Sequence, residues 1–297
     1  MDPKIDIIII SYNSSKHLTK CLESIVENLN LGNIYNITVI DNGSSDNTLE
    51  ILNQFSNSIN IIQNNSNVGF AKACNQGIKM GKGKYIFLLN PDTELLNDSV
   101  SIFYNYFEQA GNQKSWCTGA QLFDEKNHIS KSFGRFPNLL DVFAEQLGIK
   151  GIFLKSSYIQ KTMRNPKFIK PVEVPYVMGC NMFIRRSIFD DIGLFDERFF
   201  LNFEETELAW RAKNAGYKCM LLPEARIIHH SGKSFTDLKS YLSHLWYGQL
   251  MFFKITQTKF VFYMAKVLHL FGSLLRLLFK LDNFYWTHAK KIWSIKL

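Results

Sequence analysis

Two segments of the sequence place acidic side chains where they can do chemistry, and a third segment ends in histidines. Asp92 lies in a polar loop that directly follows an apolar run, and His229 ends a second apolar run. A carboxylate and an imidazole at strand ends can bind a divalent cation. Glu204 and Glu205 are adjacent carboxylates among aromatic residues. Mutual repulsion and poor solvation raise the pKa of a carboxylate, which suits it to act as a general base.

Each of these segments also has a purely structural interpretation. Asp92 can cap a helix that begins near Glu94. The acidic cluster can form the first turn of a helix that the helix dipole stabilises, with Glu207 paired to Arg211 four residues later. His229 can be a hydrogen-bonded residue at the edge of a sheet. Taken one at a time, the segments leave both interpretations open.

The elements that would position these residues follow a regular order. Short β-branched runs alternate with amphipathic stretches, and Ser14 and Ser15 can cap the first helix. This order predicts an α/β fold with a doubly wound, mainly parallel sheet. Ligands of such sheets bind beyond the carboxyl ends of the strands, where this sequence has polar loops. We expect strands at 5–10, 37–40, 59–62 and 85–89, helices after residue 15 and at 48–55 and 70–80, and binding loops at 11–13, 41–46 and 90–94.

The sequence lacks a glycine-rich phosphate loop. Neither G-x-G-x-x-G nor G-x-x-x-x-G-K-[ST] follows the first expected strand. A nucleotide site without such a loop must manage the phosphate charge by other means, and a divalent cation, Mg²⁺ or Mn²⁺, is the simplest. A nucleotidyltransferase is one class of enzyme that a carboxylate-rich nucleotide site suggests. The absence of a glycine-rich loop argues against it.

The net charge of +8 is concentrated at one end of the chain. From Lys254 onward, eight basic residues stand against one acid, Asp282, and alternate with Phe, Leu and Trp. A nucleic-acid enzyme would be expected to spread basic charge around its cleft. We therefore expect an anionic membrane surface as the partner of this tail, and no nucleic acid.

Residues 260–281 predict an apolar helix with one narrow polar stripe. Burying each Lys or Arg at the centre of a bilayer costs about 2.5–3.5 kcal/mol. A helix lying in the membrane plane with its stripe hydrated is therefore favoured over a spanning helix. Packing on the rest of the chain or in a homodimer is the alternative. The stripe consists of Lys266, His269, Ser273, Arg276 and Lys280.

The cysteines, the N-terminal segment and the changes in pattern along the chain indicate its location and its domain boundaries. Five scattered cysteines form no C-x-x-C pair, and no secretory signal precedes the first strand, so we expect a cytoplasmic protein, peripheral on the inner face of the membrane. Residues 131–175 are irregular and suggest a mobile connection or an acceptor-side insertion, before order resumes at 176–234. We expect a catalytic domain at 1–235, with a nucleotide-binding half at 1–125 and an acceptor half at 126–235, and a basic amphipathic helical tail at 236–297.

Six motifs, in their order and spacing over roughly residues 4–235, together resemble family 2 glycosyltransferases, particularly the rhamnosyltransferase-like branch. The motifs are IISYN at 9–13, VIDNGSSD at 39–46, NVGFAKACNQG at 67–77, LNPDTE at 89–94, GCNMFIRR at 179–186, and FDE at 195–197 leading into the acidic cluster and the two histidines. The resemblance implies a GT-A fold and inverting transfer of a sugar from a nucleoside diphosphate to an acceptor hydroxyl. The membrane-seated tail favours a lipid-linked or cell-surface glycan as the acceptor.

The resemblance also implies roles for individual residues. Asp41 would contact the nucleotide base, and Asp92 would hold the metal with His229, although Asn90 stands where many relatives have Asp. Glu205 occupies the position of the catalytic base, and Glu204 is the lesser candidate. The expected substrate-binding residues are Ser11, Tyr12, Asn13, Asp41, Asn42, Asn67, Gly69, Phe70, Asn75, Asn90, Asp92 and Gly179. A catalytically inactive sugar-nucleotide-binding subunit is the non-enzyme alternative, and the intact metal and base positions argue against it.

Overall fold

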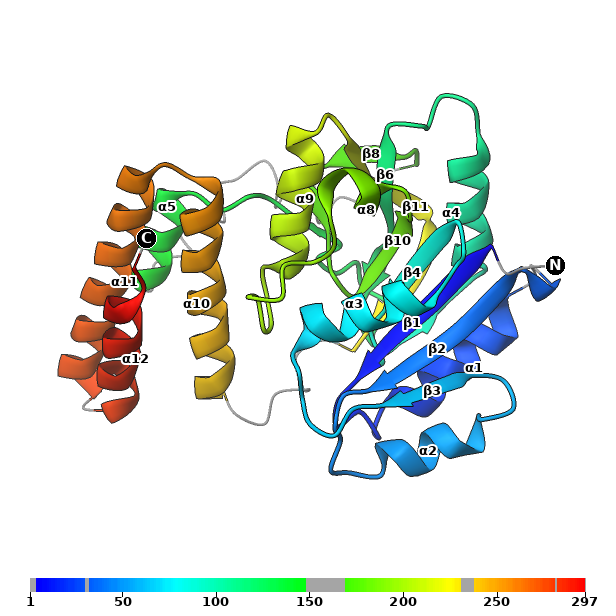
Figure 1. Cartoon of the computed structure of the whole chain (residues 1–297), viewed down its shortest axis with the longest axis horizontal. Coiled ribbons are helices and arrows are strands. Elements are labelled where there is room, and N and C mark those ends of the chain that lie inside the picture. The colour runs from blue at the N-terminus through cyan, green and yellow to red at the C-terminus, as the bar shows by residue number, and fades with distance from the viewer. Residues whose placement is uncertain (1–3, 30–31, 148–168, 231–237, 281, 297) are drawn as a thin grey trace.

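A nine-stranded mixed sheet in the order β3-β2-β1-β4-β10-β6-β11-β5, with β8 paired to β11, forms the centre of the computed structural model (Figure 1). The structure describes residues 4–29, 32–147, 169–230, 238–280 and 282–296. The strands are β1 (Ile5–Ser11), β2 (Tyr35–Asp41), β3 (Asn60–Gln63), β4 (Tyr85–Leu89), β5 (Thr93–Leu95), β6 (Ser115–Phe123), β8 (Val172–Val174), β10 (Asn181–Arg185) and β11 (Lys218–His229). A two-stranded sheet joins β7 (Phe133–Gly134) to β9 (Tyr176–Val177).

Three neighbouring strands, β2, β1 and β4, run parallel, and β1 and β4 are buried along their whole length. β1 pairs in parallel with β2 and β4, whereas β10 is antiparallel to both β4 and β6. Because side chains alternate along a strand, Ile7 and Ile9 enter one core cluster and Ile8 and Ile10 the other. The covering helices are α1 (Leu18–Asn28), α2 (Thr48–Gln54), α3 (Phe70–Met80), α4 (Ser99–Glu108), α8 (Ile188–Ile192) and α9 (Glu204–Asn214). The expected doubly wound α/β sheet is confirmed.

Two local expectations are wrong. Ser14 and Ser15 do not cap α1, because the helix begins later in the chain, with His17 as its N-cap. The backbone N–H of Ser14 donates to Thr48 Oγ1 at 2.8 Å, and that of Ser15 donates to the Asp46 carboxylate. No helix begins near Glu94, because this segment pairs with β11 as the short strand β5. The serines therefore tie the first binding loop to the second, and Asp92 precedes a strand.

The segment expected to be irregular contains a helix, α5 (Leu139–Gln146), which begins with a capping box formed by Asn138 and Asp141. Residues 148–168 of the expected insertion lie outside the described part of the chain, as do residues 231–234 at the end of the next expected segment. α5 packs against α11 (Lys259–Lys280), so a segment from within 126–235 joins the helices of the tail. The domain boundary at residue 235 stays a prediction.

The tail forms three helices, α10 (Leu238–Thr256), α11 and α12 (Asn283–Ser294), which stand with α5 beside the sheet domain (Figure 1). The polar stripe of α11 faces into this group. His269 is fully buried between Gln146 and Gln249, with each ring nitrogen 2.9 Å from a side-chain amide. Arg276 donates to Gln146 Oε1 at 2.6 Å. The expectation of a hydrated stripe is therefore wrong for His269 and Arg276, because α5 and α10 supply their polar partners.

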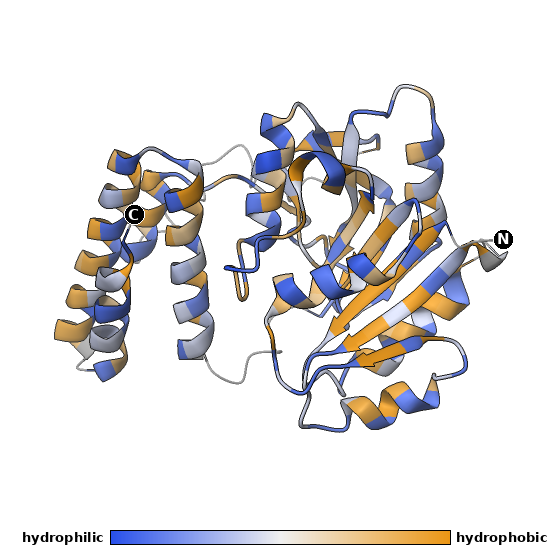
Figure 2. Cartoon of the chain, in the orientation of Figure 1, coloured by the Kyte–Doolittle hydropathy of each residue, from blue (hydrophilic) through white to orange (hydrophobic). Residues whose placement is uncertain are grey.

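The opposite face of α11 is apolar and exposed. Figure 2 shows apolar residues along this helix, and Phe279 is 84% exposed. Residues 259–279 have a mean hydropathy of 1.5 with 28% of them buried, so α11 is long and apolar enough to cross a membrane, although this is weak evidence on its own. The exposed apolar residues of α11, named here the outer face, are Phe260, Tyr263, Met264, Val267, Phe271, Leu274, Leu278 and Phe279.

Candidate active site

The carboxyl ends of β1 and β2 form the first part of the site. The parallel register places Ser11 beside Asp41, and the Asn42 N–H donates to the Ser11 carbonyl at 2.7 Å. Asp41 is fully buried, and one of its carboxyl oxygens accepts from the Ser44 N–H at 3.3 Å. The other oxygen is buried without a hydrogen-bond partner, as is the Ser11 hydroxyl. Buried acceptors without partners are costly, so this position suits a donor group of a ligand.

Asparagine side chains shape the loop that leads into α3. Asn42 donates from Nδ2 to Asn67 Oδ1 at 3.0 Å and accepts at Oδ1 from the Val68 N–H at 3.1 Å. Asn67 Oδ1 also accepts from the Gly69 N–H at 2.9 Å. Gly69 has φ +90°, which favours glycine, and the Phe70 N–H donates to the Phe200 carbonyl at 2.8 Å. These expected binding residues therefore lie together and hold one loop against the segment that precedes α9.

Three other expected binding residues have distinct surroundings. Asn13 adopts the left-handed conformation, with φ +50°, and its Oδ1 accepts from the Ser45 N–H at 2.8 Å. Tyr12 is exposed at the same edge. Asn75 lies apart, because its amide is used within the fold: Nδ2 donates to the Phe195 carbonyl at 2.9 Å, and Oδ1 accepts from the N–H of the same residue.

Asp92 and His229 meet because β5 pairs with β11 and places Thr93 opposite His229. His229 Nε2 lies 3.4 Å from Asp92 Oδ1, and the His230 N–H donates to the Asp92 carbonyl at 2.9 Å. Burial raises the pKa of Asp92, but the hydrogen bond and charge of His229 outweigh it and lower that pKa overall. Burial lowers the pKa of His229, but the Cys180 sulfur and Asp92 together raise it overall.

Sequence reasoning missed the setting of His230. Its Nε2 lies 2.6 Å from Glu94 Oε1, its Nδ1 lies 3.0 Å from Glu125 Oε1, and its ring stacks on that of His17 at 4.6 Å. The sequence shows the two adjacent histidines, but it does not show that the tertiary fold brings Glu125 next to His230. Within the described ranges, no group of three or more Asp, Glu, His or Cys side chains is placed to hold a metal. Asp92 and His229 are two suitable ligands for Mg²⁺ or Mn²⁺, which also accept phosphate and water oxygens.

The acidic cluster opens α9, as the helical interpretation expected. Glu204 is buried, and its Oε2 has no hydrogen-bond partner. Burial, followed by the charge of Glu205, raises the pKa of Glu204 well above its usual value. Glu205 is partly exposed, and burial raises its pKa despite the opposing charge of Lys131. Glu205 therefore combines access to solvent with the raised pKa of a general base.

The start of β10 joins this cluster to the Asp92 loop. A Cβ at Gly179 would lie 3.6 Å from Glu205 Cγ, so Gly179 lies directly against that side chain. The next residue, Cys180, accepts at its carbonyl from the Asn90 N–H at 3.0 Å. The general-base candidate and the metal-binding candidates therefore lie on either side of one short segment.

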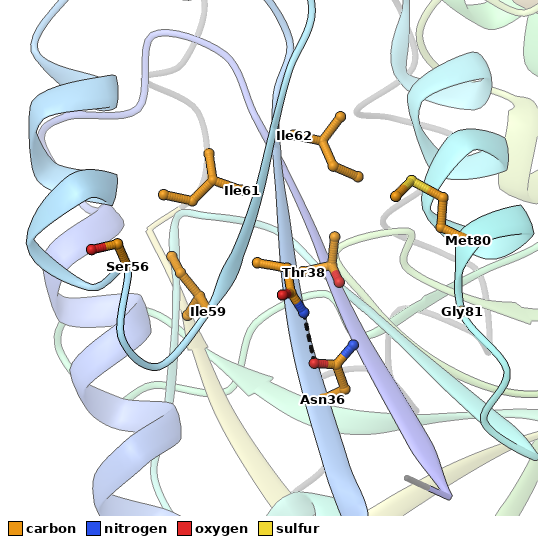
Figure 3. A pocket seen from close by; sticks show the side chains of 9 residues that line it. Asn36, Thr38, Ser56, Ile59, Ile61, Ile62, Met80 and Gly81 are labelled. Carbon is orange, nitrogen blue, oxygen red and sulfur yellow. Dashed lines mark hydrogen bonds between the residues drawn. The ribbon is translucent and has the colours of Figure 1, made fainter. Parts of the chain in front are cut away.

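A cavity of about 550 Å³ lies away from these residues, between β2, β3 and the end of α3 (Figure 3). Asn36, Asn60 and Met80 are among its lining residues, and the lining contains no charged side chain. Asn36 and Asn60 belong to the amino-terminal parts of their strands, whereas Asp41 ends β2. This cavity offers no catalytic group, so the site is defined by the strand ends.

The fold and the site together define a GT-A type of nucleotide-sugar enzyme. The mannosyltransferase PcManGT from Pyrobaculum calidifontis, solved with GDP-Man and Mn²⁺, matches 100% of this chain and 77% of its own with a TM-score of 0.58 and 12% identity. The family model of glycosyl transferase family 2 matches residues 6–193, and the chain belongs to this family. The expected resemblance is confirmed, and the protein is a glycosyltransferase. Glu205 and His229 lie beyond the matched residues.

Curated relatives extend the similarity over most of the chain. The N-acetylglucosaminyl-diphospho-decaprenol L-rhamnosyltransferase of Mycobacterium tuberculosis (strain CDC 1551 / Oshkosh) is 23% identical over 247 residues, covering 79% of this chain and 78% of that protein. Rhamnosyltransferase WbbL of Escherichia coli (strain K12) is 27% identical over 252 residues, covering 80% and 89%. The rhamnosyltransferase-like branch suggested by the motifs is thus represented among the relatives.

The structural member of the acidic cluster is Glu207, and its role can be separated from catalysis. Its carboxylate accepts two hydrogen bonds of 2.7 Å from Arg211, which also donates to the carbonyls of Gly193 and Leu194. Breaking a buried ion pair costs about 3–5 kcal/mol, and partial exposure of Arg211 reduces this to about 2–3 kcal/mol for Glu207→Ala. We predict this loss in urea unfolding, with the transfer rate of the remaining folded enzyme unchanged. A dead but equally stable variant would instead make Glu207 part of the chemistry.

Proposed function

We propose that this protein is a metal-dependent, inverting glycosyltransferase that moves a hexosyl unit, with rhamnosyl as the first candidate, from a nucleoside diphosphate to an acceptor hydroxyl. The observation that carries the proposal is that Glu205 lies against Gly179 while the loop of Asp92 is bonded to the next residue, Cys180, with Asp92 and His229 3.4 Å apart. Inverting transfer needs one base and stabilisation of one leaving group, and this arrangement supplies a candidate for each.

The donor nucleotide would bind at the ends of β1 and β2. The unpartnered oxygen of Asp41 is available to accept a hydrogen bond from the nucleotide base. The exposed ring of Tyr12 at the same edge offers an apolar surface against which a base can lie. The loop held by Asn42 and Asn67 closes the other side of this position.

Asp92 and His229 would hold Mg²⁺ or Mn²⁺ together with the donor diphosphate. The bound cation would neutralise the charge that develops on the departing diphosphate. Asp92 carries a lowered pKa and is therefore ionised at neutral pH, whereas His229, whose pKa is raised beside Asp92, must release its proton when the cation binds. The pairing of β5 with β11 fixes the backbone of His229, and the hydrogen bond from the His230 N–H fixes the backbone of Asp92. The two side chains are therefore held close to each other.

Glu205 would remove the proton of the acceptor hydroxyl as that oxygen attacks the anomeric carbon. The proton passes to the Glu205 carboxylate, the bond between the sugar and the diphosphate breaks, and the configuration at the anomeric carbon inverts. No covalent sugar–enzyme intermediate is needed. The absence of a side chain at Gly179 leaves room beside Glu205.

The outer face of α11 suggests that the acceptor is held at a membrane. His269 and Arg276 of the polar stripe are bonded by residues of α5 and α10, so the apolar face of α11 can enter the headgroup region of a bilayer while the group of helices stays folded. Anionic lipid would attract the basic residues of the tail at about 1 kcal/mol each. This placement on the inner face of the membrane suits a lipid-linked glycan such as the one in the name of the mycobacterial relative.

Removing the base is the first test of the proposal. Glu205→Gln should lower kcat by roughly 10²–10⁴-fold, the usual worth of a positioned general base, with donor affinity unchanged. Because burial raises the pKa of Glu205, wild-type transfer should fall as the pH drops through a value above about 4.3, the usual pKa of Glu. Transfer and calorimetric donor binding measure both effects.

Glu204→Gln is the matched control, since it changes the neighbouring carboxyl. If Glu204→Gln is inactive and Glu205→Gln is normal, the base has been assigned to the wrong residue. A wild type that binds donor but transfers nothing to any acceptor would favour the inactive binding subunit.

Removing the metal is the second test. Chelation with EDTA should abolish transfer and added Mg²⁺ or Mn²⁺ should restore it, while Asp92→Asn or His229→Ala should weaken restoration because one of the two protein ligands is lost. His128→Ala, at an exposed histidine that pairs with Asp124, is the control. Full activity in the chelator would contradict metal dependence and shift stabilisation of the leaving group to Arg or Lys side chains.

The membrane surface gives the third test, on the full chain. The double variant Phe271→Asp/Leu278→Asp should bind anionic vesicles at least about 10²-fold more weakly, because burying each apolar side chain is worth about 1.5–3 kcal/mol. Vesicle flotation measures this, and Val26→Asp, at an exposed apolar residue of α1, is the control. Equal binding by both variants would place the membrane contact elsewhere. Resistance of the wild type to carbonate extraction would mean that α11 spans the bilayer.

A further inference from the structure

The segment that leads into the catalytic-base candidate is held by a helix of the tail. α10 is the tail helix that faces the catalytic domain (Figure 1). Its Gly248 lies so close to this segment that a Cβ there would be 2.8 Å from the Asn202 carbonyl oxygen and 3.1 Å from a ring carbon of Phe203. A real Cβ essentially never approaches backbone this closely. Only glycine therefore allows α10 its present position.

The held segment has an unusual backbone. Asn202 and Phe203 are consecutive non-glycine residues in the left-handed conformation, with φ +66° and +73°. Such residues cost free energy and persist only where their surroundings hold them. Hydrogen bonding within the segment gives little compensation, because the buried amide nitrogen of Asn202 has no partner. The holding contacts must therefore come largely from packing.

α10 provides much of that packing. Phe252 and Met251 form a buried cluster with Phe199, and the Phe252 ring lies 6.1 Å from the ring of Phe203. One turn before Gly248, the ring of His244 stacks on that of Phe200 at 4.9 Å. Residues 199–203 thus contact α10 along three of its turns.

The same segment connects directly to both sides of the site. Phe203 is the N-cap of α9, and its carbonyl accepts from the Glu207 N–H at 2.9 Å, so its position sets where the first turn of the helix begins. Glu205 belongs to that turn. At the other end, the Phe200 carbonyl accepts from the Phe70 N–H of the donor-side loop.

We propose that α10 positions the catalytic base, and that Gly248 is the positioning residue through which it does so. This inference rests on the proposed role of Glu205. The helices of the tail then form part of the catalytic machinery as well as a membrane contact. A tail helix that moved away from residues 199–203 would release the left-handed pair and let the start of α9, with Glu205, leave its place beside Gly179.

Gly248→Ala in the full-length protein tests the proposal. The added methyl group must displace the Asn202 carbonyl or α10 itself, and a misplacement of about 1 Å at a reacting group can cost about 10²-fold in rate. We expect kcat to fall by about that factor. Calorimetric donor affinity should fall much less than kcat, because the methyl group is added beside Asn202 and Phe203, whereas the donor-side loop is bonded to Phe200. Gly272→Ala is the matched control: it makes the same change in α11, where the neighbour is the Gln146 side chain.

The measured outcomes separate this inference from the proposed function. A folded Gly248→Ala enzyme with wild-type kcat overturns the inference alone, and equal losses in Gly248→Ala and Gly272→Ala would mean that general loosening of the helices is responsible. If Gly248→Ala fails to fold, His244→Ala decides: removing the stacked ring should lower kcat by about tenfold in a protein that is still folded at the assay temperature, and wild-type kcat would again overturn the inference. A wild type without transfer to any acceptor would instead refute the proposed function.

Discussion

The site depends on where β10 enters the sheet. β10 runs antiparallel between β4 and β6, and this places its first residues beside the residues that follow β4. The Asn90–Cys180 hydrogen bond is the direct result, and Gly179 then lies against Glu205. Had the strand entered one residue out of register, its side chains would have exchanged faces and the general-base candidate Glu205 would have lost its neighbour. A pairing constraint within the sheet thus sets the distance between the metal-binding candidates and the general-base candidate.

Much of the sheet and half of the site could be predicted from the sequence, because local patterns encode them. Runs such as Ile7–Ile10 are apolar at every position, as expected of a strand buried on both faces. Asp41 and Asp92 follow such runs directly. The neighbours of His230 and Asn75 could not be predicted, because Glu125 and the Phe195 segment reach them only through the tertiary fold. The prediction that Ser14 or Ser15 caps α1 also failed, because the helix begins only after His17.

The polar stripe of α11 shows that an amphipathic sequence pattern does not reveal what will contact each side of the helix. The pattern correctly separated a polar side from an apolar side, but water and the polar groups of another helix satisfy a polar side equally well. Gln146 and Gln249, which occupy the stripe, lie 103 residues apart and on different helices. Because these two side chains bond His269, the polar side of α11 is buried and its apolar face is left outward. In our proposal the outer face of α11 therefore makes the membrane contact, while the polar side is buried among the helices instead of being hydrated.

This arrangement links two properties that the sequence presents as separate. The outer face of α11 meets lipid in our proposal, α11 packs against α10, and α10 holds residues 199–203. An exposed apolar helix face is a cost in water, and a left-handed pair of residues is a cost in the folded chain. Both costs are reduced by the same group of helices when it is seated on a membrane and packed on the catalytic domain. The base would then be best ordered where a lipid-linked acceptor is present, so the position of the protein and the geometry of its chemistry depend on one packing interface.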